Sequence, residues 1–478
     1  MTVLTNGFGV GESAEPARGT RACDSACAHA ALLAAGARSL HEADPLLAGL
    51  LDAELADQQD TLALVASTSA ADPSVLAAAA AALANVTAEG YPGARYHPGT
   101  RRLDEVELLA EERARAAFRA RYANVQPHSC SSANLSVLLS LLPAGGRILG
   151  LDLDSGGHLT HGSPASVSGR IFSAIHYRLG ADGRIDYAEV ARLAHRHRPG
   201  VVIAGASAYP RHIDFARFRQ IADEVGAYLL ADISHIAGLV VAGIHPSPID
   251  HAHVTTTSTY KQLGGPRGGL ILLGRDHLAP GPDGRTPLAT LLRQAVFPRS
   301  QGTPNPAAMA AKARAFALLC TPEFGGTARR IRHDARALAA ALLDRGYDLL
   351  TGGTDNHMVV ADLRPTGISG LVAERALEEC GILANRNRIP GDHRPPSVAS
   401  GLRLGTNVVA QRAMGPAEMR RCAALIDDVL RAVTVVDDVS YELDPQVRRS
   451  VRAEVRALCA RFPLPGYGTA HRAAEVAR

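Results

Sequence analysis

The chain has 478 residues, of which 46% are hydrophobic and 20% are charged, and its formal net charge is +3 at pH 7. This composition predicts a globular protein of two or three domains, and a balance so close to neutral argues against a dedicated nucleic-acid or membrane-surface binder. No apolar run approaches the ~20 residues that a membrane helix needs, and the N-terminal segment lacks the pattern of a secretory signal.

The cysteines and lysines add two constraints. Seven dispersed cysteines favour reduced thiols in a cytoplasm, and Cys23, Cys27 and His29 lack the second ligand pair of a zinc site, so no metal site is predicted. Only Lys261 and Lys312 are lysines among the 50 basic residues. A lysine in so arginine-rich a chain indicates a position that arginine cannot fill, such as a Schiff base, which requires an amine that can lose its proton.

The N-terminal two thirds of the chain predict an extension, an arm and a large domain. Residues 1–43, rich in Ala, Gly and Ser, predict a flexible extension, and an arm at 44–95 begins with a helix that runs into a short apolar segment. Over 96–322, helical stretches alternate with short apolar runs, which predicts a largely parallel sheet with helices on both faces. Its strands are expected at 147–153, 201–207, 228–233, 254–258 and 268–273.

The remainder, 323–478, predicts a smaller C-terminal α/β domain that follows a helix at 307–319. Within it, helical and apolar segments are expected at 326–345, 356–363, 370–380, 401–406 and 416–433. An extra amphipathic helix is expected at 444–461.

Two of the expected strands end in residues that could share a pocket. Lys261 follows a β-rich run and precedes a glycine-rich turn at 264–269, so the strand would present its amine at the carboxyl end, where α/β sheets collect ligands. A solvated surface lysine is the alternative. Asp232 ends a buried apolar run and needs a partner there, unless it caps a helix. His235 and Ser207 could face the same pocket.

Three further segments could complete that pocket. His158 and His161 lie in a glycine-rich segment that a ring or phosphate could approach, and an imidazole could stack on such a ring; a metal would require an acidic third ligand that the neighbouring sequence lacks. Residues 129–134 form a small-residue turn entering a helix, which suits phosphate. Arg403, in a short apolar strand, could bind a carboxylate bidentately.

Together these residues match what pyridoxal phosphate chemistry needs of a protein. Lys261 would form the imine, Asp232 would keep the pyridine nitrogen protonated, residues 129–134 would hold the phosphate and Arg403 would hold a substrate carboxylate. The sequence therefore predicts an enzyme that acts on the bonds of a small amino acid.

A series of motifs resembles the serine hydroxymethyltransferase family over about residues 44–435. They are EGYPG at 89–93, YANVQPHS at 122–129, GGHLTHG at 156–162, GGPRGG at 264–269 and GGTDNH at 352–357. The resemblance implies a fold-type I, aminotransferase-like α/β large domain with a mixed, mostly parallel sheet and a smaller C-terminal α/β domain.

The resemblance also implies roles for individual residues. Lys261, Asp232, His158 and Glu89 would be catalytic, with Glu89 managing protons at the hydroxymethyl group. The cofactor would be bound by Ser129, Ser131, His158, Ser207, Asp232, His235, Tyr260 and Lys261, and by a turn at Gly302 and Thr303 from a neighbouring subunit. The substrate would be bound by Ser67, Glu89, Tyr96, His97 and Arg403. The folate pocket would be lined by Leu153, Gly157, Leu159 and Asn387.

Departures from the family pattern lie close to these positions. The residues that differ are Thr68, Ser69, Thr87, His97, Pro98, Asp154, Ser155, Ser258 and Tyr260, together with a phosphate turn at 299–303 that is poor in glycine. Because changes near a reacting centre can alter substrate choice, two activities stay open. The first is interconversion of serine and glycine with tetrahydrofolate. The second is a folate-independent aldolase or transaldolase reaction on threonine, α-methylserine or another β-hydroxy amino acid.

A third reading is a non-catalytic relative that serves as a binding or regulatory subunit. For the enzyme, we expect pyridoxal 5'-phosphate as cofactor, tetrahydrofolate as co-substrate and no nucleic-acid or membrane partner. The resemblance also implies a cytoplasmic homodimer with shared active sites, or a tetramer.

Overall fold

Two units make up the protein, and they divide between Leu50 and Leu51. The structure, a computed structural model, describes residues 27–468. Helix α1 (Ala28–Ala43) has no buried residue, and α2 (Pro45–Asp60) follows it. Ala28–Ala43, within the predicted extension, therefore form a helix, which alanine and leucine favour, while the flexibility of the extension stays a prediction. The rest of that prediction, together with Cys23, lies outside the described residues.

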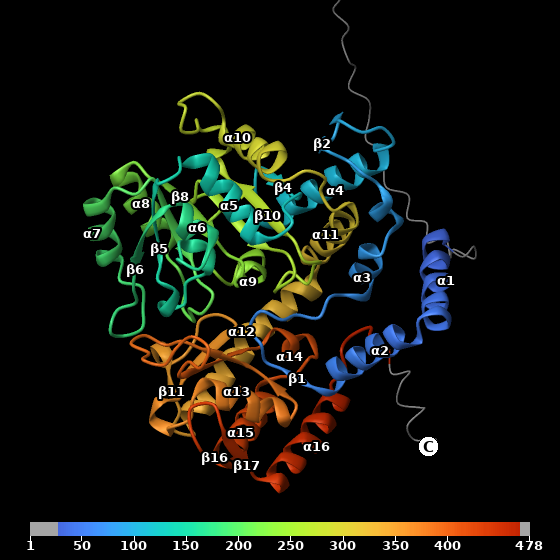
Figure 1. Ribbon diagram of the computed structural model, residues 1–478, viewed down its shortest axis with the longest axis vertical. Helices are drawn as coiled ribbons and strands as arrows, with labels where there is room; N and C mark the ends of the chain where they lie inside the picture. Colours follow the sequence, from blue (N-terminus) through green and yellow to red (C-terminus); the bar gives the residue numbers. More distant parts are fainter. Residues whose placement is uncertain (1–26, 469–478) are drawn as a thin grey trace, which may run out of the picture. The chain divides into compact units, whose positions relative to one another are not determined.

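A seven-stranded sheet forms the centre of the larger unit (Figure 1), in the order β4-β10-β9-β8-β7-β5-β6. Neighbours from β9 to β6 pair in parallel, whereas β10 pairs antiparallel with β9 and with β4. This confirms the predicted mixed, mostly parallel sheet. Its strands are β4 (Tyr122–Asn124), β5 (Arg147–Leu151), β6 (Ser173–Tyr177), β7 (Val201–Gly205), β8 (Tyr228–Asp232), β9 (Val254–Ser258) and β10 (Gly269–Leu273).

Helices cover both faces of this sheet. Along β7, Val201 and Ile203 pack into one buried cluster, while Val202 and Ala204 pack into the other, as expected where side chains alternate between two covered faces. One cluster includes residues of α4 (Arg101–Phe118), α7 (Tyr187–His197), α8 (Phe215–Val225), α9 (Ala237–Val241) and α11 (Pro306–Leu319). The other includes residues of α5 (Cys130–Leu141) and α10 (Leu288–Gln294).

The carboxyl ends of the parallel strands meet at one edge of the sheet. Strand β8 ends at Asp232, and Lys261 lies three residues after the end of β9. Ser207 follows β7, and His158 lies in the loop after β5. Because these strands run in the same direction, four predicted site residues from distant parts of the chain are brought to one edge.

A second, four-stranded antiparallel sheet has the order β11-β12-β15-β14. Its core includes residues of the long helix α12 (Pro322–Leu343) and of α13, α15 and α16. These elements are β11 (Asp348–Leu349), β12 (Met358–Asp362), β14 (Asn385–Asn387), β15 (Gly401–Gly405), α13 (Gly370–Glu379), α15 (Pro416–Arg431) and α16 (Pro445–Arg461). The expected C-terminal α/β elements are present, while the domain boundaries at 96 and 323 stay a prediction.

The remaining short elements lie outside the two large sheets. Strand β1 (Leu62–Ala63) pairs in parallel with β13 (Ile382–Leu383) in a separate two-stranded sheet, and the Gly405 amide of β15 donates to Leu64 O at 2.7 Å. The others are α3 (Pro73–Ala79), α6 (Val167–Ile171), α14 (Asn407–Gln411) and the hairpins β2–β3 (Gly90–Tyr91 and Ala94–Arg95) and β16–β17 (Val433–Val435 and Tyr441–Leu443).

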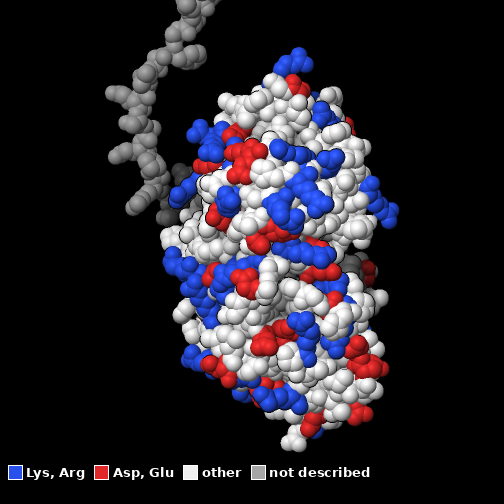
Figure 2. All heavy atoms as spheres, turned by 90° about the vertical axis from the view of Figure 1, so that its left-hand side faces the viewer, with Lys and Arg blue, Asp and Glu red and all other residues white. Residues whose placement is uncertain are grey.

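The surface carries both signs of charge. On the face drawn in Figure 2, basic and acidic side chains are interspersed. Over residues 27–468, no helix combines the length and the apolar character that crossing a membrane requires.

Candidate active site

Lys261 belongs to the group of strand-edge residues that the sequence predicts to share a pocket, and its side chain is almost fully enclosed. The residue is 8% exposed, so the alternative of a solvated surface lysine is wrong. Within residues 27–468 no hydrogen bond to its Nζ is present. Burial lowers the pKa of Lys261 to about 8, although the negative charge of Asp232 opposes this shift. About a tenth of the amine is therefore neutral, and nucleophilic, at pH 7.

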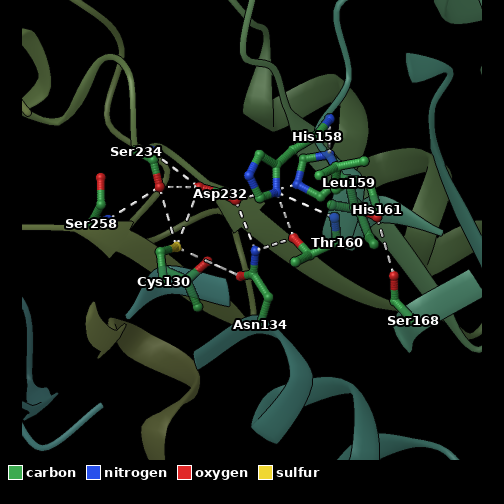
Figure 3. Close-up of polar contacts among 12 residues, drawn as sticks. Cys130, Asn134, His158, Leu159, Thr160, His161, Ser168, Asp232, Ser234 and Ser258 are labelled. Carbon is green, nitrogen blue, oxygen red and sulfur yellow. Dashed lines mark hydrogen bonds and ion pairs between the residues drawn. The ribbon is translucent and has the colours of Figure 1, made fainter. Parts of the chain in front are cut away.

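Asp232 is surrounded by hydrogen-bond donors (Figure 3). One carboxylate oxygen accepts from Ser234 Oγ at 2.6 Å and the other accepts from Asn134 Nδ2 at 2.8 Å; His161 Nε2 lies 3.2 Å from the second oxygen. Burial opposes ionisation, but the hydrogen bonds from His161 and Ser234 hold the pKa of Asp232 well below its usual range. The alternative of a helix cap is wrong, since α9 begins after Ile236. Asp232 is thus a fixed anion.

The hydrogen bonds define the tautomers of the two histidines. The backbone N–H groups of Thr160 and His158 donate to His158 Nδ1 and to His161 Nδ1, at 3.2 and 3.4 Å. Each neutral ring therefore carries its proton on Nε2, and His161 donates that proton to Asp232. Burial lowers the pKa of His158 to about 4, so its ring is neutral and suited to stacking on an aromatic cofactor.

These residues also form a cluster that the sequence did not reveal. Ligand atoms of His158, His161 and Asp232 lie within 4.8 Å of one another. The sequence next to the two histidines supplies no acidic third ligand, but the fold does, because Asp232 at the end of β8 lies beside them. Since the three side chains hydrogen-bond within one network with Asn134 and Thr160, we assign the cluster to fixing the carboxylate. The predicted lack of a metal site stays a prediction.

Arg403 projects from β15 toward the edge of the large sheet. Its Nη1 donates to the carbonyl oxygen of Ser207 at 2.6 Å and its Nε donates to Asn385 Oδ1 at 3.2 Å. The amide of Ser207 in turn donates to Gly156 O at 2.7 Å. Burial lowers the pKa of Arg403 to about 10, so it remains a cation. Strand β15 of the second sheet therefore places a guanidinium, fixed by two hydrogen bonds, beside the edge of the large sheet.

The amino end of α5 carries Ser129 and Ser131, the residues predicted to hold a phosphate. Ser129 caps the helix, because its Oγ accepts from the Ser132 amide at 3.0 Å, and the Ser129 amide donates to Ser132 Oγ at 3.0 Å. Ser131 is exposed in the first turn. A Cβ at Gly269 would press against Ser129 O, so glycine is needed for β10 to pass this close.

His235 and Ser67 lie on the side of the pocket next to Arg403. The rings of His235 and His357 stack at 6.0 Å, and burial lowers the pKa of both histidines, that of His357 to about 3. The carbonyl oxygen of Ala66 lies 3.1 Å from His357 Nε2 and accepts from Asn407 Nδ2 at 3.0 Å. These bonds hold the backbone on which Ser67 stands.

Tyr260 lies beside Lys261. The Lys261 Nζ lies 6.0 Å from its ring centroid, and the guanidinium of Arg267 lies 4.2 Å from the same centroid. A cation over one face of the ring fixes its position by a cation–π contact.

The remaining substrate and phosphate candidates form a separate group. Glu89 precedes the β2–β3 hairpin, and a Cβ built on Gly302 would lie 3.1 Å from Glu89 Oε1. Tyr96 is 75% exposed and its ring lies 5.7 Å from that of Phe297. His97 has a buried Nδ1 without a partner, and Thr303 is half-buried. Within the described chain, no hydrogen bond or ring contact joins this group to Lys261, Asp232 or Arg403.

The four candidates for the folate pocket are near one another. Leu153 and Leu159 are 39% and 47% exposed, and Gly157 is buried against Leu151 O. Asn387 adjoins Arg388, whose Nη1 donates to Asp154 Oδ1 at 2.5 Å. That ion pair joins the segment after β5 to β14.

Some residues of the site escaped the sequence analysis. Ser234, Thr160, Asn134, His357 and Asn407 fix Asp232, His158 and the Ser67 backbone. Ser234 could have been found, since a serine two residues after a strand-end aspartate commonly bonds its carboxylate. The others depend on tertiary contacts that local sequence does not carry.

Comparison with known proteins assigns the family. The model of the serine hydroxymethyltransferase family matches residues 40–426. The serine hydroxymethyltransferase of Rhizorhabdus wittichii is 46% identical over 428 residues, which cover 89% of this chain and 95% of that protein. Those of Afipia carboxidovorans and Zymomonas mobilis are 47% identical over 427 and 426 residues, and each alignment covers 89% of this chain and 96% of the relative. With its fold-type I sheet and its strand-edge lysine, the chain belongs to the serine hydroxymethyltransferase family.

Proposed function

We propose that this chain holds pyridoxal 5'-phosphate on Lys261 and interconverts serine and glycine, with tetrahydrofolate as the one-carbon acceptor. The observation that carries the proposal is the buried Lys261 amine, which has no hydrogen-bond partner within residues 27–468. This amine interacts electrostatically with the Asp232 carboxylate. Membership of a transferase family supports the reaction.

The residues present fit the cofactor. A fixed anion suits a protonated pyridine nitrogen, and Asp232 is such an anion; the neutral ring of His158 is suited to stack on the pyridine. Buried polar atoms without partners, at His235 Nδ1 and Ser258 Oγ, are further groups that a polar ligand could satisfy. When bound, the cofactor supplies an electron sink for the bonds of the amino-acid α-carbon.

Each further cofactor contact has a candidate. Ser129, Ser131 and the amides that begin α5 would bind the phosphate, because a helix amino end favours an anion. Ser207, His235 and Tyr260 would lie along the ring. Gly302 and Thr303 would reach the phosphate of a neighbouring subunit.

The substrate would be oriented by its carboxylate. Arg403 would bind it bidentately, since contacts to Ser207 and Asn385 hold the guanidinium in one orientation, and Ser67 would add a hydroxyl. Glu89 would hold and return the proton of the hydroxymethyl oxygen. Tyr96 and His97 would line the same side of the pocket.

The folate would lie against the segment after β5. Two partly exposed leucines, Leu153 and Leu159, offer an apolar surface for a flat ring system, and Gly157 lets the segment between them fold closely against Leu151. Asn387 would supply a polar contact opposite.

The proposal includes a homodimer with shared active sites. In this proposal the group with Glu89 and Gly302, which shares no hydrogen bond with Lys261, Asp232 or Arg403 within residues 27–468, would serve the site of the other copy. Reduced cysteines at Cys130, Cys380 and Cys422 fit the proposed cytoplasmic location. A tetramer would pair two such dimers.

The experiment is a product assay on the purified full-length protein with its cofactor. Glycine formed from serine only when tetrahydrofolate is present supports the proposal. Aldehyde released from threonine or α-methylserine without folate, with no folate-dependent glycine, would instead assign the aldolase reaction.

A further inference from the structure

The second lysine of the chain lies directly beneath the same site. Lys312, in α11, is 2% exposed. Its Nζ donates to the carbonyl oxygens of Val125 at 2.6 Å, Gly269 at 3.0 Å and Pro127 at 3.1 Å. No carboxylate forms an ion pair with it in the part of the chain that the structure describes. All three donors of one ammonium group therefore have backbone acceptors.

These three carbonyls belong to two segments of the proposed cofactor site. Val125 and Pro127 lie between β4 and Ser129, where the phosphate cradle begins. Gly269 begins β10, directly after the loop that carries Lys261, and its amide donates to Pro127 O at 2.9 Å. The ammonium thus joins the phosphate segment to the lysine loop.

The packing around the ammonium leaves little space. A Cβ on Gly268 would lie 2.8 Å from Lys312 Nζ and 3.0 Å from Thr259 Oγ1. Thr259 Oγ1 donates to Pro266 O at 2.6 Å, and the Thr259 amide donates to Gly268 O at 3.1 Å. The loop from Thr259 to Gly269 is therefore folded back against Lys312.

The residue type and its burial indicate a specific role. An arginine-rich chain keeps lysine here, where a compact ammonium can donate in three directions and a planar guanidinium cannot. Burial lowers the pKa of Lys312 to about 7, so the unpaired cation is held at an energetic cost. The three carbonyl bonds offset part of that cost.

We propose that Lys312 is a positioning residue, which holds the phosphate-binding amino end of α5 in register with the strand end that presents Lys261. The inference rests on the proposed function, because it assigns the phosphate of the cofactor to α5. It predicts that loss of the ammonium weakens binding of the phosphate group specifically.

The test compares two ligands that differ only in the phosphate. Apo-protein of the full chain, wild type and Lys312→Met, is titrated with pyridoxal 5'-phosphate and with pyridoxal, and absorbance gives each Kd. We expect the Kd for pyridoxal phosphate to rise by about tenfold or more and the Kd for pyridoxal to change by less than about threefold. A general loss of packing would weaken both ligands alike.

Arg412 provides a matched control. It is also a buried cation, 2% exposed, whose side-chain donors go to backbone carbonyls, in this case those of Gln58, Gln59, Cys459 and Phe462. Arg412→Met should lower stability and leave the ratio of the two Kd values unchanged. If Lys312→Met does not fold, Lys312→Gln is used in its place, since glutamine keeps two N–H donors. The Kd for pyridoxal phosphate should then rise less, relative to the Kd for pyridoxal, than expected for Lys312→Met.

The outcomes separate the inference from the proposed function. Equal changes for both ligands, or no change, would overturn the role of Lys312. A wild-type protein that binds neither ligand, or a Lys261→Ala variant that keeps the absorbance of bound cofactor, would overturn the proposed function instead.

Discussion

Replacing Asp232 by asparagine removes the anion of the site while nearly preserving its shape. In Asp232→Asn, the carboxamide oxygen can keep the bonds from Ser234, so its nitrogen takes the place of the oxygen that faces Asn134 Nδ2 at 2.8 Å and His161 Nε2 at 3.2 Å. The substitution therefore places an amide N–H group opposite two other N–H donors, those of Asn134 and His161.

Neither neighbour can adapt without breaking another bond. Asn134 cannot flip, because its Oδ1 accepts from Thr256 Oγ1 at 2.6 Å while its Nδ2 also donates to Thr160 Oγ1 at 2.9 Å. His161 cannot move its proton to Nδ1, because that nitrogen accepts from the amide of His158. With about 1–3 kcal/mol for each of these two unmatched buried donors, we expect the free energy of unfolding to fall by about 2–6 kcal/mol.

The loss of charge acts on the reaction as well. Removing one preorganised electrostatic group typically lowers kcat by about 10²- to 10³-fold. Without the negative charge, the pKa of Lys261 should also fall below about 8. The assays are denaturant unfolding, folate-dependent glycine formation and the pH dependence of cofactor capture.

A Ser234→Ala variant is the matched control. It removes the 2.6 Å bond to Asp232 but keeps the charge, so it should lose about 1 kcal/mol of stability and much less activity. If Asp232→Asn kept kcat within about threefold of wild type, the assignment of Asp232 to the ring nitrogen would be refuted.

Three other expectations follow from single features of the structure. Arg403→Lys should raise KM for serine by about 10- to 100-fold, because an ammonium cannot replace a bidentate guanidinium; steady-state kinetics with an unchanged KM would contradict the role of Arg403 in binding the carboxylate. Capture of cofactor by the apo-protein should speed up with pH around a midpoint near pH 8, because burial lowers the pKa of Lys261 to about 8 and only the neutral amine condenses; a rate that is flat from about pH 6 to about pH 10 in stopped-flow absorbance would contradict this. Phe218→Ala, at a fully buried ring in contact with Tyr177 and Tyr187, should lower stability by about 3–5 kcal/mol in thermal unfolding with little effect on kcat; a loss below about 1 kcal/mol would contradict its place in the core.

Buried strands were predicted well because a strand that is buried on both faces has apolar residues at successive positions in the sequence. The runs expected at 201–207 and 228–233 are β7 and β8 with their ends shortened by one or two residues, and the run at 254–258 is β9. β4 and β6 were missed. β4 has only three residues, and β6 is an edge strand whose side chains are mostly only partly buried, so neither forms an apolar run.

Helix α1 was missed for a different reason. None of its residues is buried, and its alanine-rich composition gives little of the amphipathic pattern by which a sequence reveals a helix. Local helix propensity accounts for it instead.

Site residues could be predicted where the role depends on the charge of the residue itself. Lys261, Asp232 and Arg403 each stood out as a charge in or beside an apolar strand, and the structure brings them to one pocket. Asn134 and His357 were not predictable, because their roles depend on hydrogen bonds to residues 98 and 291 positions away in the chain. Such contacts exist only after the two sheets have formed.

The central claim is that Lys261, and not the equally buried Lys312, carries the cofactor. The direct measurement is reduction of the cofactor-loaded protein with borohydride, followed by peptide mass analysis to locate the trapped pyridoxyl group. The account predicts one modified side chain, at Lys261, with Lys312 unmodified. A label on Lys312, or no label despite bound cofactor, would contradict it.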